Sequence, residues 1–242
     1  MSAAFRFKQF GIEQDLCAMK VGTDGVLLGA WAEGGSHILD VGCGTGVVSL
    51  MMAQRCPEAS VTAIDIMADC CRQASGNVAK SPWGDRIKVE NLSLQDFTRR
   101  AEEGCAEGES RCLFDSIVSN PPFYEASLKN PDKARATARH NDSLPFGVLS
   151  KCVSVLLAPG GVFSVVMAEE CCREFIDEAW FAGLYLADTV KVFTKRGKPA
   201  KRRLMRFSRV RTAGPTETEA VLLNGDGSRS DWFKALTSDF YL

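Results

Sequence analysis

The chain has 242 residues, of which 45% are hydrophobic and 24% are charged, and its formal net charge is −1. This composition is that of an ordinary globular α/β domain, and it provides no overall basic field of the kind that binds nucleic acid. No apolar run reaches the roughly 18 residues of a membrane span, and residues 1–11 lack the apolar region of a signal peptide. We expect a cytoplasmic protein of one domain, made of an N-terminal arm and helix (1–36), a core (37–210) and a C-terminal strand and helix (211–242).

Ten cysteines are many for a chain of this kind, yet no two of them form a Cys-x-x-Cys pair, and the chain has only two histidines. This pattern argues against a zinc site, so we expect no metal. Without an export signal the cysteines are expected to be reduced thiols that pack as small hydrophobes.

Residues 5–21 alternate between apolar and polar types, which predicts a hairpin or an extended arm. A helix is expected after residue 25, and two interpretations of the residues before it remain open. Thr23 or Asp24 caps that helix, or Lys20, Thr23 and Asp24 form the rim of a ligand pocket.

A strand over residues 37–41, a glycine-rich turn and a helix over 47–55 form the opening unit of a nucleotide-binding sheet. The turn reads Gly42-Cys43-Gly44-Thr45-Gly46, which is not the dinucleotide spacing. Asp40 lies inside the end of the strand, two residues before the first glycine, where its carboxylate would repel a pyrophosphate and attract a cationic group. The turn is therefore expected to bind a ligand that carries a positive charge.

Two further acids follow predicted strands, Asp65 after residues 60–64 and Asp96 after residues 86–91. Asp65 lies 19 residues beyond Gly46, the position from which a carboxylate reaches a ribose diol. An isolated acid at a strand end is usually a turn former. Three of them beside a glycine turn predict one ligand cleft at the carboxyl edge of a parallel sheet.

The next strand, residues 114–118, runs into Ser119-Asn120-Pro121-Pro122-Phe123. Because proline fixes its own φ and restricts the residue before it, this segment is a stiff edge of carbonyl acceptors beside an aromatic ring. Such an edge suits a planar group that bears an NH2, although a simple strand-ending turn would use the same residues.

The remaining pattern completes a Rossmann-like fold, a seven-stranded mostly parallel sheet with helices on both faces and an antiparallel hairpin at its edge. Helices are expected over residues 67–80, 144–157 and 169–182, strands over 162–167, 185–193, 204–210 and 219–223, and a short helix over 232–236. Residues 99–112 resemble a solvated insertion, and the polar loop 124–145 is expected to become ordered on RNA.

Residues 191–211 contain ten lysines and arginines and no acid. A solvated loop is the simpler interpretation, but this density of uncompensated charge favours contact with phosphate backbones. The residues predicted to bind RNA are Lys195, Arg196, Lys198, Lys201, Arg202 and Arg203.

The run from Asp40 to Gly46 together with Asp65 resembles the S-adenosylmethionine site of class I methyltransferases, and the run from Asn120 to Phe123 resembles the motif with which some of them methylate planar amino groups. Residues 5–10, 17–31, 195–203 and 236–242 are further similar to the YfiC-type bacterial tRNA adenine-N6 methyltransferases, which modify the adenine beside the anticodon of a valine tRNA. The resemblance covers nearly the whole chain and is weakest over 99–112.

The resemblance implies a tRNA methyltransferase in which Asn120, Pro121, Pro122 and Phe123 are the catalytic residues, and we expect a monomer. The cofactor-binding residues would be Lys20, Thr23, Asp40, Gly42, Cys43, Gly44, Gly46, Asp65, Ile66, Asp96 and Asn120. Asp40 and the glycine turn would hold the methionine part of S-adenosylmethionine, Asp65 the ribose and Asp96 the adenine amine. We expect tRNA as the partner and neither a metal nor a membrane.

Other functions fit parts of the same pattern. The acceptor motif also serves enzymes that methylate guanine N2 in rRNA, adenine in DNA or a glutamine amide in protein, and the basic segment favours nucleic acid among these. A non-catalytic binding module would not need the Asn120 edge. A nucleotide-dependent oxidoreductase is disfavoured by the glycine spacing and by Asp40.

Overall fold

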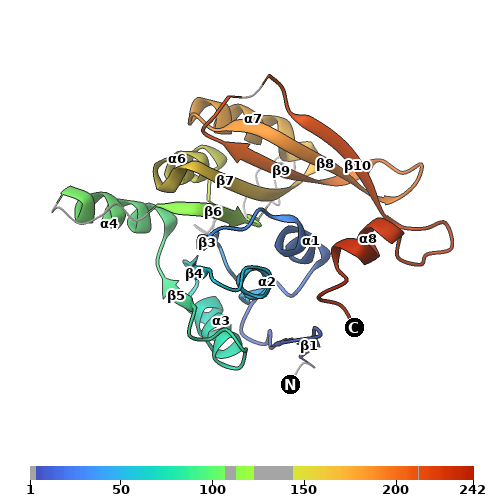
Figure 1. The fold of residues 1–242 in the computed structure, drawn as a ribbon, viewed down its shortest axis with the longest axis horizontal. Helices are drawn as coiled ribbons and strands as arrows, with labels where there is room; N and C mark the ends of the chain where they lie inside the picture. Colours follow the sequence, from blue (N-terminus) through green and yellow to red (C-terminus); the bar gives the residue numbers. More distant parts are fainter. Residues whose placement is uncertain (1–3, 107–112, 123–143, 212) are drawn as a thin grey trace, which may run out of the picture.

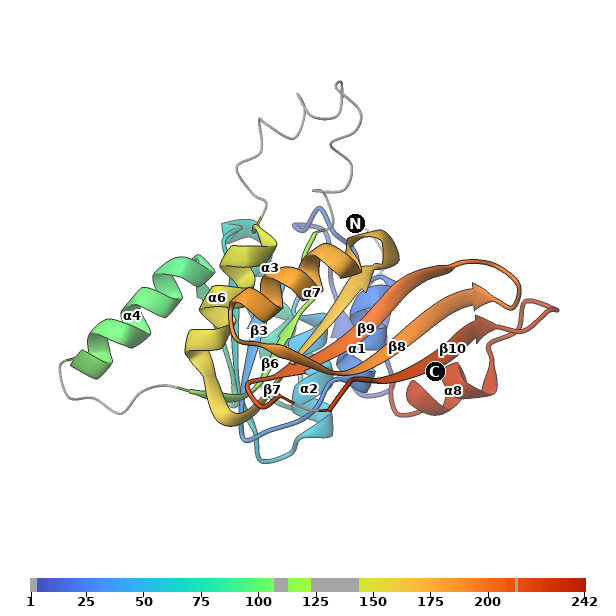
Figure 2. The same cartoon turned by 90° about the horizontal axis from the view of Figure 1, so that it is seen from above.

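The protein is described by a computed structural model that covers residues 4–106, 113–122, 144–211 and 213–242. Its centre is an eight-stranded sheet with the strand order β10-β8-β9-β7-β6-β3-β4-β5. Helices α1, α2, α3 and α8 lie on one side of this sheet and α4, α6 and α7 on the other (Figures 1 and 2). The expected mostly parallel sheet between two helical layers is thereby confirmed.

The strands of the sheet are β3 (His37–Val41), β4 (Ser60–Asp65), β5 (Ile87–Asn91), β6 (Phe114–Ser119), β7 (Leu157–Ala168), β8 (Tyr185–Lys195), β9 (Ala200–Ser208) and β10 (Thr216–Leu223). The helices are α1 (Thr23–Trp31), α2 (Val47–Arg55), α3 (Ala68–Ala79), α4 (Leu94–Ala106), α6 (Phe146–Leu156), the 3₁₀ turn η2 (Glu169–Cys171), α7 (Cys172–Phe181) and α8 (Asp231–Leu236).

Strands β5, β4, β3, β6 and β7 are parallel, and β9 is antiparallel to both β7 and β8. The strand count differs from the expected seven because β10 pairs in parallel with β8. The β8–β9 hairpin is therefore not the edge of the sheet. An uncovered β8 would expose unpaired backbone groups, and β10 satisfies them.

Two apolar layers hold the helices to the sheet. Fully buried Leu27, Leu28 and Met51 of α1 and α2 pack on one face, whereas Phe146 of α6, Phe163 of β7 and Phe175 of α7 fill the other. Buried strands such as Ile38-Leu39 alternate between these layers. The core thus fixes the carboxyl ends of β3, β4 and β6, where the ligand cleft is expected.

The N-terminal arm forms the small antiparallel pair β1 (Phe5–Arg6) and β2 (Gly11–Ile12), as one of the two expected forms of the arm. It meets the C-terminal tail, because the Lys8 amide donates to the Phe240 carbonyl at 2.8 Å and the Phe7 and Tyr241 rings stack with centroids 5.9 Å apart. The N-terminal arm and the C-terminal tail therefore lie side by side, and Gln54 of α2 donates to the Asp239 carbonyl of the tail (Figure 1).

The boundaries of α3, α7 and α8 differ from the sequence prediction by only a few residues, whereas α1, α6 and α4 differ in ways that have a structural reason. Helix α1 starts at Thr23 with Gly22 at its N-cap and no side-chain cap, so neither Thr23 nor Asp24 caps it. Helix α6 ends at Leu156, before the expected Pro-Gly-Gly stop, because β7 begins at once. Helix α4 takes in Asp96 and the first part of the expected insertion, since Ser93 caps it. The loop 124–145 lies outside the described residues except for Leu144 and Pro145.

No described helix combines the length and the apolar character that crossing a bilayer requires. The cysteines whose side chains are described are free thiols, namely Cys17, Cys43, Cys56, Cys70, Cys71, Cys152, Cys171 and Cys172.

Candidate active site

A cleft of about 530 Å³ opens at the carboxyl ends of β3 and β6. It brings together the start of α1, the glycine turn after β3 and the segment after β6, as expected for strand ends that share one edge of a parallel sheet. The described residues that line it are Met19, Lys20, Gly22, Thr23, Asp24, Gly25, Asp40, Gly42, Cys43, Gly44, Thr45, Val47, Val48, Asn120, Pro121, Pro122 and Arg202.

The glycine turn has a backbone conformation that residues other than glycine rarely adopt. Gly42, Gly44 and Gly46 have φ values of 73°, 54° and 81°. Gly46 is also the N-cap of α2, and a Cβ there would lie 3.2 Å from the Cβ of Ala74. At Gly42 and Gly44 a Cβ would meet no atom within 4 Å, so there the backbone borders open space. The turn is therefore shaped for a ligand that approaches the main chain closely.

Asp40 lies at the base of the cleft and is only 1% exposed. The Ser49 hydroxyl donates to its carboxylate at 2.5 Å. Burial raises the pKa of Asp40 to about 7, and the Ser49 hydrogen bond opposes that rise. At neutral pH the carboxyl is therefore only partly ionised, and a ligand cation beside it would favour its ionised form.

Asp65 ends β4 and holds the glycine turn from below. Its carboxylate accepts from the Gly44 amide at 2.9 Å and from the Met67 amide at 2.8 Å. The Asn91 side chain donates to the carbonyls of Asp65 and Ile66. Asp65 and the exposed Ile66 border the turn rather than the described lining of the cleft.

Asp96 is not among the described lining residues either. It occupies the first turn of α4, where Ser93 donates to its carboxylate at 2.7 Å and Arg99 pairs with it at 2.7 Å. Its amide in turn donates to the Ser93 hydroxyl at 3.1 Å, which is a helix cap. The structure therefore shows a capping role, and the contact with a cofactor adenine stays a prediction.

The acceptor edge follows β6 directly. The Ser119 hydroxyl donates to the Val41 carbonyl at 3.0 Å, which fixes the end of β6 against the end of β3. Asn120, Pro121 and Pro122 then line the cleft, whereas Phe123 lies outside the described residues. The stiff edge is thus held next to the glycine turn.

The arm before α1 forms another wall, which sequence reasoning placed only in part. Asn77 of α3 exchanges hydrogen bonds with the backbone of Glu13 at 2.8 and 2.9 Å, and it also donates to the Thr45 carbonyl at 2.9 Å. Gln73 accepts from the Leu16 amide. These buried amides tie the arm to the glycine turn, and Met19 on the arm lines the cleft. No local pattern in the sequence marks Asn77 or Gln73.

The six predicted RNA-binding residues divide into two groups. Lys195, Arg196 and Lys198 lie at the turn between β8 and β9, with exposed Lys201 just after it. In Figures 1 and 2 this turn projects at the margin of the molecule. Arg202 and Arg203 are instead paired with acids from elsewhere in the chain.

Arg202 lines the cleft and its Nε donates to Asp24 at 2.6 Å. Arg203, only 14% exposed at its side chain, pairs with Glu169 and also with Glu217 at 3.3 Å. The basic segment contains no acid in its own sequence, but in the folded protein acids of α1, η2 and β10 pair with two of its arginines. The uncompensated charge is therefore concentrated at the β8–β9 turn.

Comparison with known proteins gives the same picture from another direction. The methyltransferase small domain family model matches residues 21–141. A tRNA1(Val) (adenine(37)-N6)-methyltransferase of Bacteroides fragilis is 46% identical over 241 residues, which is 98% of this chain and 97% of that protein. The protein of the same name from Yersinia enterocolitica is 40% identical over 246 residues and covers 98% of this chain and 92% of its own.

Among solved structures, a predicted O-methyltransferase from Agrobacterium tumefaciens superposes with a TM-score of 0.67. It is 20% identical in sequence, and the match covers 90% of this chain and 96% of that one. At this identity the likeness supports the fold alone.

Proposed function

The chain belongs to the family of the tRNA1(Val) (adenine(37)-N6)-methyltransferases, and we propose that it transfers a methyl group from S-adenosylmethionine to the N6 of an adenine in tRNA. The observation that carries this proposal is the single cleft that joins the glycine turn and Asp40 to the Asn120-Pro121-Pro122 edge. One side suits a cationic cofactor and the other suits a planar amine, so donor and acceptor would meet in the middle.

The chemistry of the donor set fits S-adenosylmethionine. Its ammonium group would pair with the buried carboxylate of Asp40, whereas the pyrophosphate of a dinucleotide would be repelled by it. Lys20, Thr23 and the residues Gly42, Cys43, Gly44 and Gly46 would hold the methionine end. Asp65 and Ile66 would contact the ribose side, and Asp96 the adenine amine. When bound, the cofactor supplies an electrophilic methyl group on a sulfonium.

The acceptor edge would act through hydrogen bonds rather than through a strong base. The lone pair of an adenine amine is delocalised into its ring, which makes the amine a poor nucleophile. The Asn120 side-chain oxygen and the Pro121 carbonyl would accept its two N–H bonds and draw the nitrogen toward tetrahedral geometry. Phe123 would stack on the base, a contact of roughly 1–3 kcal/mol. The amine proton would leave after the nitrogen has become cationic, so catalysis rests on positioning.

The substrate assignment can be tested directly. The protein would be incubated with labelled S-adenosylmethionine and, separately, tRNA, rRNA, DNA and protein, and the digests examined for N6-methyladenosine. A valine tRNA transcript with guanosine in place of the adenosine beside the anticodon is the matched control. Label in guanine would instead indicate a guanine N2 methyltransferase, and label in a glutamine amide a protein methyltransferase. Either result would contradict the proposal. We further propose that the enzyme acts in the cytoplasm. We also propose that it is a monomer, and light scattering with and without tRNA would check the oligomeric state.

Asn120→Ala separates chemistry from cofactor binding. Removal of the acceptor oxygen is expected to lower kcat by about 10²- to 10³-fold, the typical cost of losing one stabilising hydrogen-bond partner in a transition state. Cofactor affinity, measured by calorimetry, should change little. Asn224→Ala in the exposed turn before α8 removes the same group outside the described lining of the cleft and should leave kcat unchanged. Normal methylation by Asn120→Ala would exclude this mechanism.

A further inference from the structure

An ion pair stands in the wall of the cleft where the basic hairpin meets it. Arg202 of β9 donates from Nε to Asp24, in the first turn of α1, at 2.6 Å. The side chains are 34% and 24% exposed, so the pair is accessible from the cleft. Both residues line the cleft, and the other cation in its described lining is Lys20.

This pair lies on the acceptor side of the cleft. Gly25 follows Asp24, and a Cβ at Gly25 would lie 3.9 Å from Nδ2 of Asn120. The first turn of α1, whose Asp24 binds Arg202, therefore also borders the acceptor edge. Arg202 is in addition only two residues beyond the start of β9, which leads back to the exposed cations of the β8–β9 turn. An RNA chain crossing that turn would reach the cleft at Arg202.

The neighbouring arginine shows that this placement is specific to Arg202. Successive residues of a strand face opposite sides of the sheet. Arg203 accordingly points to the other side, where Glu169 and Glu217 pair with it. Arg202 alone among the six predicted RNA-binding residues lines the described part of the cleft.

A base can enter the cleft only if its own sugar and phosphates come to the rim. A planar guanidinium can meet a phosphate with parallel N–H bonds. In Arg202 the Asp24 carboxylate at Nε and the Lys201 carbonyl at Nη1, 2.8 Å away, fix the orientation of the group. We propose that Arg202, oriented by Asp24, binds the phosphodiester next to the target adenosine and so holds the base against the Asn120-Pro121-Pro122 edge. The inference rests on the proposed RNA methylation and adds the substrate-binding residue that places the base.

A neutral backbone linkage tests the contact. Anticodon stem-loop RNAs would carry a methylphosphonate at the linkage 5′ or 3′ of the target adenosine, or at one distant linkage as a control. With the wild-type enzyme, one of the two adjacent substitutions should lower kcat by about 10- to 100-fold, the size of a charge-assisted hydrogen bond. Arg202→Gln should show the same loss on unmodified RNA and no further loss on the neutral linkage.

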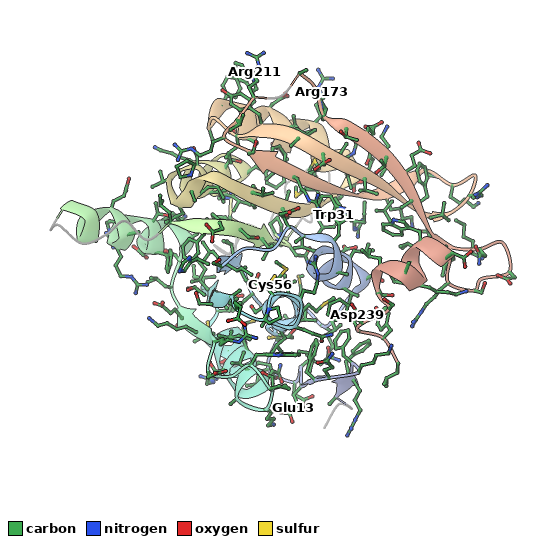
Figure 3. All side chains as sticks on the ribbon, viewed as in Figure 1. Glu13, Trp31, Cys56, Arg173, Arg211 and Asp239 are labelled. Carbon is green, nitrogen blue, oxygen red and sulfur yellow. The ribbon has the colours of Figure 1, made fainter. Side chains whose placement is uncertain are left out.

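Three companion variants separate this role from a structural one. Arg202→Lys should retain part of the wild-type loss of kcat on the neutral linkage. Asp24→Asn should show a smaller loss than the wild-type enzyme, because the guanidinium is less well oriented. Arg173→Gln removes an equal charge from α7, near the top of Figure 3, and should retain the wild-type response. Lys198→Gln at the hairpin turn should raise KM and leave kcat and the linkage sensitivity unchanged.

The outcomes are distinct. If Arg202→Gln remains as sensitive to the neutral linkage as the wild-type enzyme, Arg202 does not bind that phosphate. If Arg202→Gln instead raises the KM for S-adenosylmethionine, its partner is the cofactor carboxylate, and the inference is wrong. If the wild-type enzyme methylates none of these RNAs, the proposed function fails before Arg202 is tested.

Discussion

The two halves of the sheet build their parts of the cleft in opposite ways. In the parallel half, from β5 to β6, the site consists of backbone amides, glycines and one buried carboxylate that directly follow buried strands. In the half from β7 to β10 the charged side chains are held by acids from distant segments, such as Asp24 and Glu169. The first arrangement is local in sequence and the second exists only in the folded protein.

This difference assigns a separate task to each half. A cofactor of fixed shape suits a rigid backbone turn, whereas an RNA backbone suits exposed cations on a projecting hairpin. The ion pairs of Arg202 and Arg203 attach the start of β9 to α1, η2 and β10, whereas the exposed cations lie at the β8–β9 turn. The predictions below test whether the halves are separable.

The largest effect is expected at the buried acid of the parallel half. Asp40→Asn should weaken S-adenosylmethionine binding by roughly 30- to 1,000-fold, the usual cost of removing one member of a buried charge pair. In the wild-type protein the affinity should also fall as the pH drops below about 7, because Asp40 is then protonated. Calorimetric titration at pH 6, 7 and 8 measures both effects. Asp231→Asn, at a fully exposed side chain, should have neither.

The same substitution should stabilise the protein without its cofactor. Burial raises the pKa of Asp40 from its ordinary value of 3.8 to about 7. Between these pH values the unfolded chain ionises while the folded protein keeps its proton, so the contribution of Asp40 to the free energy of unfolding falls as pH rises. Asparagine does not titrate, and Asp40→Asn should gain a few kcal/mol at pH 8 (~1.4 per pKa unit) and less at pH 5. Equal gains at both pH values in denaturant titrations would contradict this account.

In the other half, Arg203 and Lys198 should respond differently to the same change. Arg203→Gln removes the partner of Glu169 and one partner of Glu217, which keeps Lys191, and should lower the free energy of unfolding by about 1–3 kcal/mol. Lys198→Gln should change stability by less than about 0.5 kcal/mol. It should instead weaken tRNA binding and reduce the slope of log K against log salt by about one. Denaturant titration and salt-dependent tRNA binding measure the two quantities. Equal losses of stability in the two variants would contradict the distinction between paired and exposed cations.

The sequence predicted the parallel half better than the other half, for a physical reason. The limits of α2 (Val47–Arg55) agree with prediction because a glycine turn precedes it and most of its residues are apolar. Asp40 and Asn120 were found because one lies in the last residues of a buried strand and the other directly follows one. The pair of Asp24 with Arg202 joins residues 178 positions apart, and no local pattern encodes it. The parallel pairing of β10 with β8 likewise has no turn signal, which is why the strand predicted over 219–223 was not placed in the expected seven-stranded sheet.

The smallest expected effect tests how far the cofactor surface of the parallel half extends. If Asp96 binds the cofactor adenine, Asp96→Asn should weaken cofactor binding by only about 5-fold, since one hydrogen bond at a half-exposed carboxylate is worth about 1 kcal/mol. Ser93→Ala is the matched control, because it removes the cap of α4 and leaves the carboxylate in place. It should cost about 1 kcal/mol of stability with little change in cofactor affinity. Equal stability losses in both variants with unchanged affinity would mean that Asp96 only caps the helix, and that the cofactor surface ends at Asp65 and Ile66.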